Sequence, residues 1–140
     1  MQISELILVS TQIFLISFLI NLLWEVNHSV LYITCLKMKL APCMRLLTIM
    51  SIKDGFWVTL FYSMSVILFG SINIIENYIQ LIFFIALALT FSFIDEKISI
   101  KRGRWEYTGN MPTLFSVGAT PFLELAVTGV LSFMLVFLFF

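Results

Sequence analysis

Four long apolar stretches, uncharged except for Glu124 in the last, constrain this chain more than any other feature. They begin near Leu6, Phe56, Tyr78 and Pro121, and their lengths are close to the roughly 20 residues that a helix needs to cross a bilayer. Backbone amides inside a bilayer must be paired within the segment, and the stretches lack the alternation typical of barrel strands. We therefore predict an all-α, polytopic membrane protein with four transmembrane helices.

Composition supports a chain that has lipid as its main partner. Of 140 residues, 61% are hydrophobic and 11% are charged, whereas soluble domains carry about 25% charged residues. We expect one transmembrane domain over residues 1–140, with a first helix that is retained because no cleavage site follows it. The predicted helices lie at about 6–36, 54–75, 77–96 and 121–140, and the predicted loops at about 37–53 and 97–120.

The basic residues predict an orientation. All eight lysines and arginines fall in the two long loops, and the positive-inside rule places such loops in the cytoplasm. We therefore expect an antiparallel bundle in the cell membrane with both termini outside. The formal net charge is zero and there is no basic run, so we expect no nucleic-acid partner. The basic residues are Lys37, Lys39, Arg45, Lys53, Lys97, Lys101, Arg102 and Arg104.

Polar residues form a stripe on the first helix. At about 100° per residue, Asn21, Glu25, His28 and Tyr32 share one face of that helix. An ionisable side chain in the bilayer costs about 2.5–3.5 kcal/mol on insertion scales and usually faces a bundle interior. We therefore expect the stripe to face the other helices.

Acidic residues of the other helices are predicted to reach the same depth. Asp54 begins the second helix, Asp95 and Glu96 end the third, and Glu124 lies near the start of the fourth. Antiparallel packing would bring them to Glu25, beneath a loop that carries two aromatic residues. Our candidate catalytic residues are Glu25, Asp95 and Glu124. Our candidate substrate-binding residues are Asn21, Trp24, His28, Asp54, Arg104, Trp105 and Tyr107.

Acid–base chemistry fits this cluster best. Burial disfavours the charged form of a carboxyl group, so a protonated Glu25 or Glu124 would donate a proton to an apolar substrate such as an alkene. An alternative is a single ion held by Glu25, His28, Asp54 and Glu124, because Glu25 and His28 have the spacing of carboxylate metal sites in bundles. Since the chain has one histidine and dinuclear sites need two such pairs, we assign no metal, and the cofactor is unknown.

Three functions remain open at this point. We favour an enzyme or binder for an apolar lipid or isoprenoid. A second possibility is a transporter or channel subunit with Asn21, Glu25 and His28 on a proton or cation path, which would require a homo-oligomer. A third is a structural or accessory protein, whose polar cluster only holds the helices together by interhelical hydrogen bonds.

Two motifs resemble those of a known group of proteins. The segment 21–25 reads N-x-x-W-E, Asp54 opens the second helix, and 103–112 reads G-R-W-x-Y-x-x-x-M-P. The chain resembles an uncharacterised family of small prokaryotic integral membrane proteins that carry this set. The resemblance implies a four-helix membrane protein and no particular activity.

The segment 91–124 is also similar to the lycopene cyclase domain of carotenoid synthesis. That domain ends a helix with aspartate, continues with G-x-W-x-[FY], and begins the next helix with P-x-E-E. This chain departs from the pattern at Leu123, which stands where the first glutamate would be. The resemblance implies an isoprenoid substrate. The matching residues are Asp95, Gly103, Trp105, Tyr107, Pro121 and Glu124.

Overall fold

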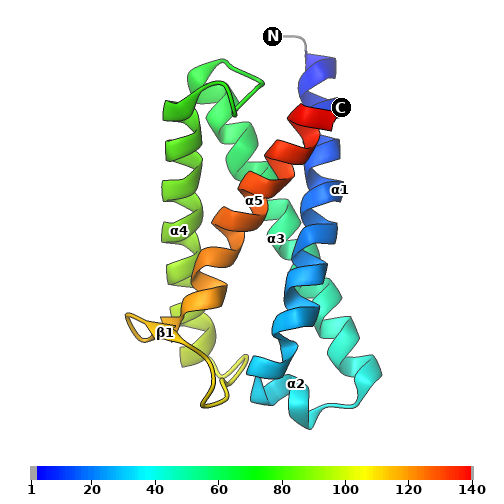
Figure 1. Cartoon of the computed structure of the whole chain (residues 1–140), viewed down its shortest axis with the longest axis vertical. Helices are drawn as coiled ribbons and strands as arrows, with labels where there is room; N and C mark the ends of the chain where they lie inside the picture. Colours follow the sequence, from blue (N-terminus) through cyan, green and yellow to red (C-terminus); the bar gives the residue numbers. More distant parts are fainter. Residues whose placement is uncertain (1–2, 140) are drawn as a thin grey trace.

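A computed structural model describes residues 3–139 of the chain as a helical bundle (Figure 1). Its long helices are α1 (Ile3–His28), α3 (Leu40–Phe69), α4 (Tyr78–Lys101) and α5 (Ala119–Phe139). Within the described part, four helices are long and apolar enough to cross a membrane, which confirms the predicted number of long apolar helices. The α1 span includes a 3₁₀ turn, η1 (Ser29–Leu31), and the short helix α2 (Ile33–Lys37) follows it.

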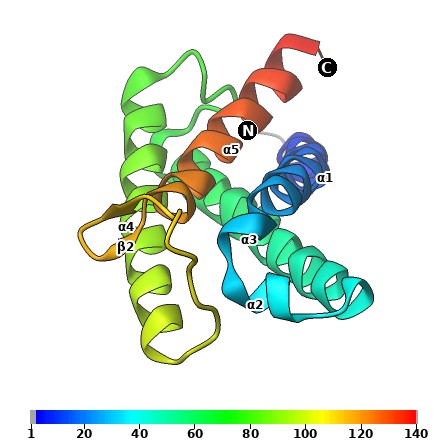
Figure 2. The ribbon, with the colours of Figure 1, turned by 60° about the horizontal axis from the view of Figure 1, so that its bottom comes forward.

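The two ends of the bundle differ in charge. Both chain termini lie at one end, whereas α2 and the connection between α4 and α5 lie at the other (Figures 1 and 2). Every lysine and arginine lies on residues 29–39 or 102–118, or in the adjoining halves of α3 and α4. We call this the basic end. At this end, a short antiparallel hairpin leads into α5; its two-residue strands are β1 (Thr113–Leu114) and β2 (Val117–Gly118).

The predicted first helix, 6–36, is wrong beyond His28. Tyr32 is extended and bridges to Tyr107. The backbone N–H of Ile33 donates to the carbonyl of Glu106, and the N–H of Thr108 donates to the carbonyl of Leu31, each at 2.8 Å. Because a distant loop pairs with these backbone groups, the helix does not continue through them.

The predicted loop at 37–53 is also wrong, since α3 begins at Leu40 and runs through it. Pro42 lies in the first turn of this helix, where its missing N–H has no helical partner to lose. The helix ends at Phe69 instead of 75, because Gly70 takes a left-handed conformation (φ 74°) and its N–H donates to the carbonyl of Val66 at 2.8 Å.

The remaining boundaries shift less. The predicted span 77–96 is α4, which starts at Tyr78 after the side chain of Asn77 accepts a hydrogen bond from the Gln80 N–H and ends at Lys101. The predicted span 121–140 is α5, which begins two residues earlier, at Ala119; residue 140 lies outside the described residues.

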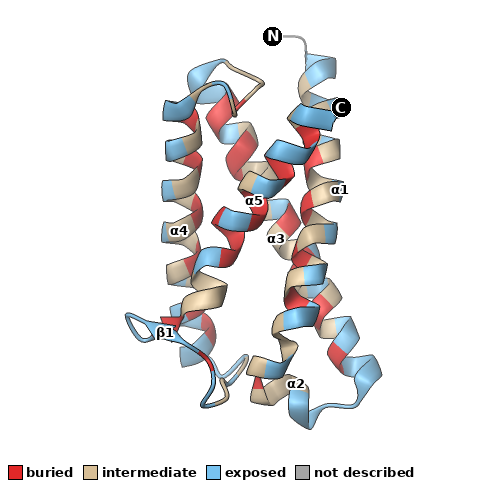
Figure 3. Cartoon of the chain, viewed as in Figure 1, coloured by how far each residue is buried: buried red, intermediate tan, exposed pale blue. Residues whose placement is uncertain are grey.

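Helix α1 buries a mainly polar face and exposes an apolar one. The buried residues of α1 recur every fourth position, and Ser17, Asn21 and Glu25 are three of the four. Leu19 and Leu23 of the same helix are 61% and 66% exposed. Figure 3 shows the buried residues facing the bundle interior. This arrangement is the one expected when the solvent is lipid.

Close packing of α1 against α3 depends on Gly55. A Cβ atom there would lie 3.3 Å from the backbone N of Phe18 and 3.4 Å from the carbonyl O of Phe14. The absent side chain therefore lets the two backbones approach. Since Asp54 precedes this glycine, the same approach brings its carboxylate toward α1.

Candidate functional site

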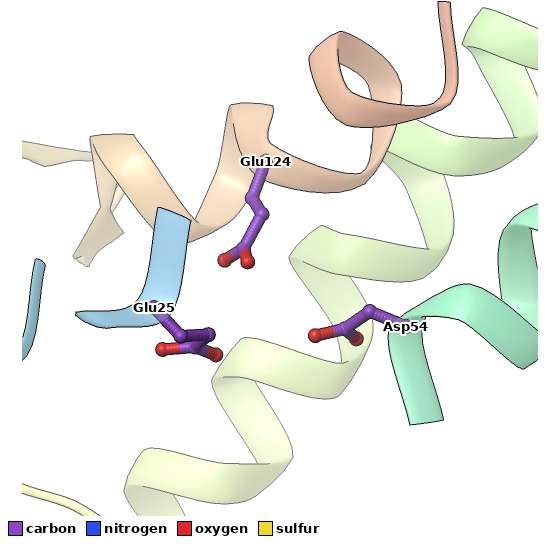
Figure 4. Close-up of side chains that lie close together, drawn as sticks. All are labelled: Glu25, Asp54 and Glu124. Atoms are coloured by element: carbon purple, nitrogen blue, oxygen red, sulfur yellow. The ribbon is translucent and has the colours of Figure 1, made fainter. Parts of the chain in front are cut away.

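Glu25, Asp54 and Glu124 form a cluster inside the bundle, which we call the carboxylate cluster. One carboxylate oxygen of each lies within 4.8 Å of the others, and Figure 4 shows the three side chains pointing toward one another from α1, α3 and α5. Glu25 and Glu124 are 7% and 6% exposed, and Asp54 is half-buried. The predicted convergence of these three residues at one depth is confirmed.

The neighbouring cations, Lys53 and Arg104, are paired with Asp95, and Lys53 also lines the cavity beside the cluster. Nζ of Lys53 lies 2.5 Å from Oδ2 of Asp95, and a guanidinium nitrogen of Arg104 lies 3.8 Å from Oδ1 of the same residue. These are the two ion pairs within residues 3–139, and neither includes the carboxylate cluster. Oε1 of Glu124 is buried and has no hydrogen-bond partner among residues 3–139.

A loop between α4 and α5, residues 102–118, covers the cluster, and we call it the lid. It is tied down at Glu96, whose Oε1 accepts hydrogen bonds from Nε1 of Trp105 at 3.0 Å and from the hydroxyl of Tyr107. The N–H of Gly118 donates to the Tyr107 oxygen at 2.9 Å. Burial and the bond to Glu96 raise the pKa of Tyr107, so its phenol stays a neutral donor.

Tyr32 completes the cover. It is buried, its ring meets that of Trp105 edge-on at 6.4 Å, and it lies 5.8 Å from the ring of Tyr107. Burial, followed by the nearby charge of Glu25, raises the pKa of Tyr32. Tyr32 and Trp105 thus line the cavity beside the cluster, and Tyr107 packs against Tyr32.

Two small spaces adjoin the cluster. The first is a cavity of about 40 Å³, whose lining includes the three carboxylates and also Lys53, Asp95 and Glu96. The second, of about 30 Å³, is lined mainly by apolar side chains of α2 and α3, and we call it the apolar crevice. Each has room for one or a few waters, and neither encloses an isoprenoid. The two share a wall made of Glu25, Tyr32, Met50 and Trp105.

His28 and Trp24 do not join the cluster. Nδ1 of His28 lies 2.9 Å from the carbonyl oxygen of Trp24, and the two rings stack at 4.7 Å. The sequence analysis included His28 in an alternative four-residue ion site, but the structure groups only Glu25, Asp54 and Glu124. Asn21 lies one turn deeper on α1, where its Nδ2 donates to the carbonyl and hydroxyl oxygens of Ser17.

The structure adds residues that the sequence analysis missed. Thr128 and Ser132 continue the buried polar face of α5 from Glu124, and their four-residue spacing was the available signal. Leu46 and Leu47 line the apolar crevice; they were missed because their segment was predicted to be a loop.

Comparison of the chain with protein-family models, with curated proteins and with solved structures found no match. The two family resemblances therefore stay predictions. The roles of Glu25, Asp95 and Glu124 stay predictions as well, and the geometry of the site carries the inferences that follow.

Proposed function

We propose that this multi-pass membrane protein binds or acts on an apolar lipid, such as an isoprenoid, at the carboxylate cluster. The observation that carries this proposal is the wall shared between the acidic cavity and the apolar crevice. Such a junction suits a molecule with one apolar part and one reacting end. In our proposal the basic end of the bundle faces the cytoplasm, in agreement with the positive-inside rule.

The size of the two spaces sets how the ligand binds. Because about 40 Å³ and 30 Å³ hold only a few atoms, only the reacting end would enter, and the remaining chain would stay in the bilayer beside α2 and α3. A membrane protein can accept a long ligand in this way without a large cavity.

Glu25 is the central residue of this proposal, since it lines both spaces. In a dry, low-dielectric site the neutral form of a carboxyl group is favoured, so Glu25 and Glu124 would exchange a proton with the ligand. The faces of Tyr32 and Trp105 would stabilise positive charge that develops on it. Asp95, predicted to be catalytic, is held by Lys53, and we assign it an electrostatic role.

The test is chemical analysis of lipids that copurify with the protein. We expect one apolar species enriched to near 1:1 with the wild type and lost in Cys35→Trp, which fills the apolar crevice. Leu36→Trp is the matched control, because Leu36 lies next in α2 and is 61% exposed. Lipid content equal to the bulk membrane, or unchanged by Cys35→Trp, would refute the proposal.

A second candidate is a proton or cation path, and one observation favours it. Buried polar residues lead from the cluster toward the bundle centre on both α1 and α5: Ser17, Asn21, Thr128 and Ser132. Oδ1 of Asn21 and Oγ1 of Thr128 have no hydrogen-bond partner within the described residues, which suits a file of water. Proton uptake by proteoliposomes that is abolished in Asn21→Leu would support this path, and uptake equal to that of empty vesicles would exclude it.

A further inference from the structure

We infer that Glu25, Asp54 and Glu124 bind one divalent cation of the hard, oxygen-preferring class, for which Mn²⁺ is a convenient probe. This site goes beyond the proposed lipid function. It rests on the carboxylate cluster alone and would exist whether or not a lipid binds.

The first argument is distance. Hard divalent cations lie about 2.0–2.6 Å from their oxygen ligands, so two ligands on opposite sides of one ion are about 4–5 Å apart. One oxygen from each of the three carboxylates lies within 4.8 Å of the others. A single ion between them would reach all three.

The second argument is charge. Three buried carboxyl groups held together cannot all be ionised without compensation, because like charges repel one another and buried charges persist only when they are compensated. Within residues 3–139, both ion pairs use Asp95, which leaves Lys53 and Arg104 engaged. A divalent ion would compensate two of the three negative charges at one position.

The third argument is independent of the clustering. Oε1 of Glu124 is a buried oxygen without a hydrogen-bond partner in the described part of the chain. Its residue is 6% exposed and its side chain points at the other two acids. Buried polar atoms nearly always have a partner, and a cation in the adjoining cavity of about 40 Å³ would supply one.

The ligand set decides the class of ion. All three ligands are carboxylates, which suit Mg²⁺, Ca²⁺ and Mn²⁺, whereas zinc sites favour thiolate and imidazole. His28, the one imidazole of the chain, is outside the group. Three protein oxygens leave coordination positions for water or for the polar end of a ligand. When the ion is bound, Glu25 and Glu124 act as ligands, and a water on the ion would take over their proton exchange.

The experiment is an electron paramagnetic resonance titration with Mn²⁺ of the full chain, purified in detergent and stripped with EDTA. We expect one saturable site, with affinity at least tenfold weaker in Glu124→Gln and in Asp54→Asn. Glu106→Gln, which changes an exposed acid of the lid, should bind as the wild type does. No saturable binding by the wild type, or equal binding by Glu124→Gln, would overturn the inference.

Thermal unfolding distinguishes loss of the cation site from misfolding of a variant. Mn²⁺ at a concentration that saturates the wild type should raise its thermal unfolding temperature, because a ligand that binds only the native state stabilises it, and should raise that of Glu124→Gln by clearly less. Equal shifts in both proteins would contradict the site. Cys35→Trp should bind Mn²⁺ normally, so lipid loss and cation loss are separable: retained Mn²⁺ binding without any enriched lipid would refute the lipid proposal alone.

Discussion

Nζ of Lys53 lies 2.5 Å from Oδ2 of Asp95 and so joins α3 to α4 at the basic end. Asp54, the next residue along α3, has no ion pair with this lysine, because Lys53 is paired with Asp95. The carboxylate cluster therefore has two buried glutamates and an aspartate with no ion pair among the described residues. This imbalance is the physical basis of the proposed cation site.

Removing the lysine should destabilise the bundle. Lys53→Met leaves Asp95 with only the more distant Arg104, at 3.8 Å, in a site where both partners of the pair are about three-quarters buried. We expect the free energy of unfolding to fall by about 1–2 kcal/mol, between the values for exposed and fully buried pairs. Chemical unfolding in detergent measures it. The double variant Lys53→Met/Asp95→Asn should recover most of the loss, and a further loss would contradict this assignment.

The lid should loosen when one hydroxyl is removed. Tyr107→Phe takes a donor from Glu96 and leaves the N–H of Gly118 without its acceptor, which should cost about 1–3 kcal/mol. We expect faster proteolysis within residues 102–118 and a lower unfolding temperature. Tyr78→Phe is the control, because Tyr78 is 70% exposed. Equal effects of the two substitutions would show that the hydroxyl does not hold the lid.

Neutralising one acid should stabilise the protein when no cation is present. Glu124→Gln keeps the size of the side chain and removes one of three acids that repel one another when ionised, so in EDTA, at a pH high enough to ionise the cluster, we expect the free energy of unfolding to rise by about 1 kcal/mol. Glu106→Gln, in the exposed part of the lid, should change it little. A decrease in Glu124→Gln would mean that the cluster is already compensated from within.

The crossing of α1 and α3 should be sensitive to a single methyl group. Gly55→Ala places a Cβ atom 3.3–3.4 Å from backbone atoms of Phe14 and Phe18, which cannot move aside as a side chain can. We expect destabilisation by about 1–3 kcal/mol, together with weaker Mn²⁺ binding because Asp54 moves with the helix. Gly109→Ala meets nothing within 4 Å and should be silent in both assays.

The sequence was sufficient for features that depend on local periodicity. Four apolar lengths predicted four spans, and the spacing of Asn21 and Glu25 predicted a buried polar face on α1. Asp54 and Glu124 could be placed beside Glu25 because antiparallel helices with known ends have little freedom in depth.

Features that depend on distant contacts could not be predicted in this way. The break after His28 follows from pairing of Leu31 and Ile33 with the lid, more than 70 residues away along the chain. The helical periodicity around 40–53 was overlooked because lysine and arginine there suggested a loop. His28 shares the polar stripe, yet its ring stacks on Trp24. Helical spacing alone does not show whether this ring contacts Trp24 or the carboxylate cluster.

Cross-linking of α1 to α5 tests the central arrangement most directly. Glu25→Cys and Glu124→Cys would be combined in a Cys35→Ser/Cys43→Ser background, treated in native membranes with a short bifunctional thiol reagent, and read by intact mass. The control pair, Glu25→Cys with Glu76→Cys, joins the basic end to the loop between α3 and α4 at the opposite end of the bundle. We expect one bridging reagent per chain for 25/124 and two separate adducts for 25/76; separate adducts at 25/124 would show that these two glutamates do not meet.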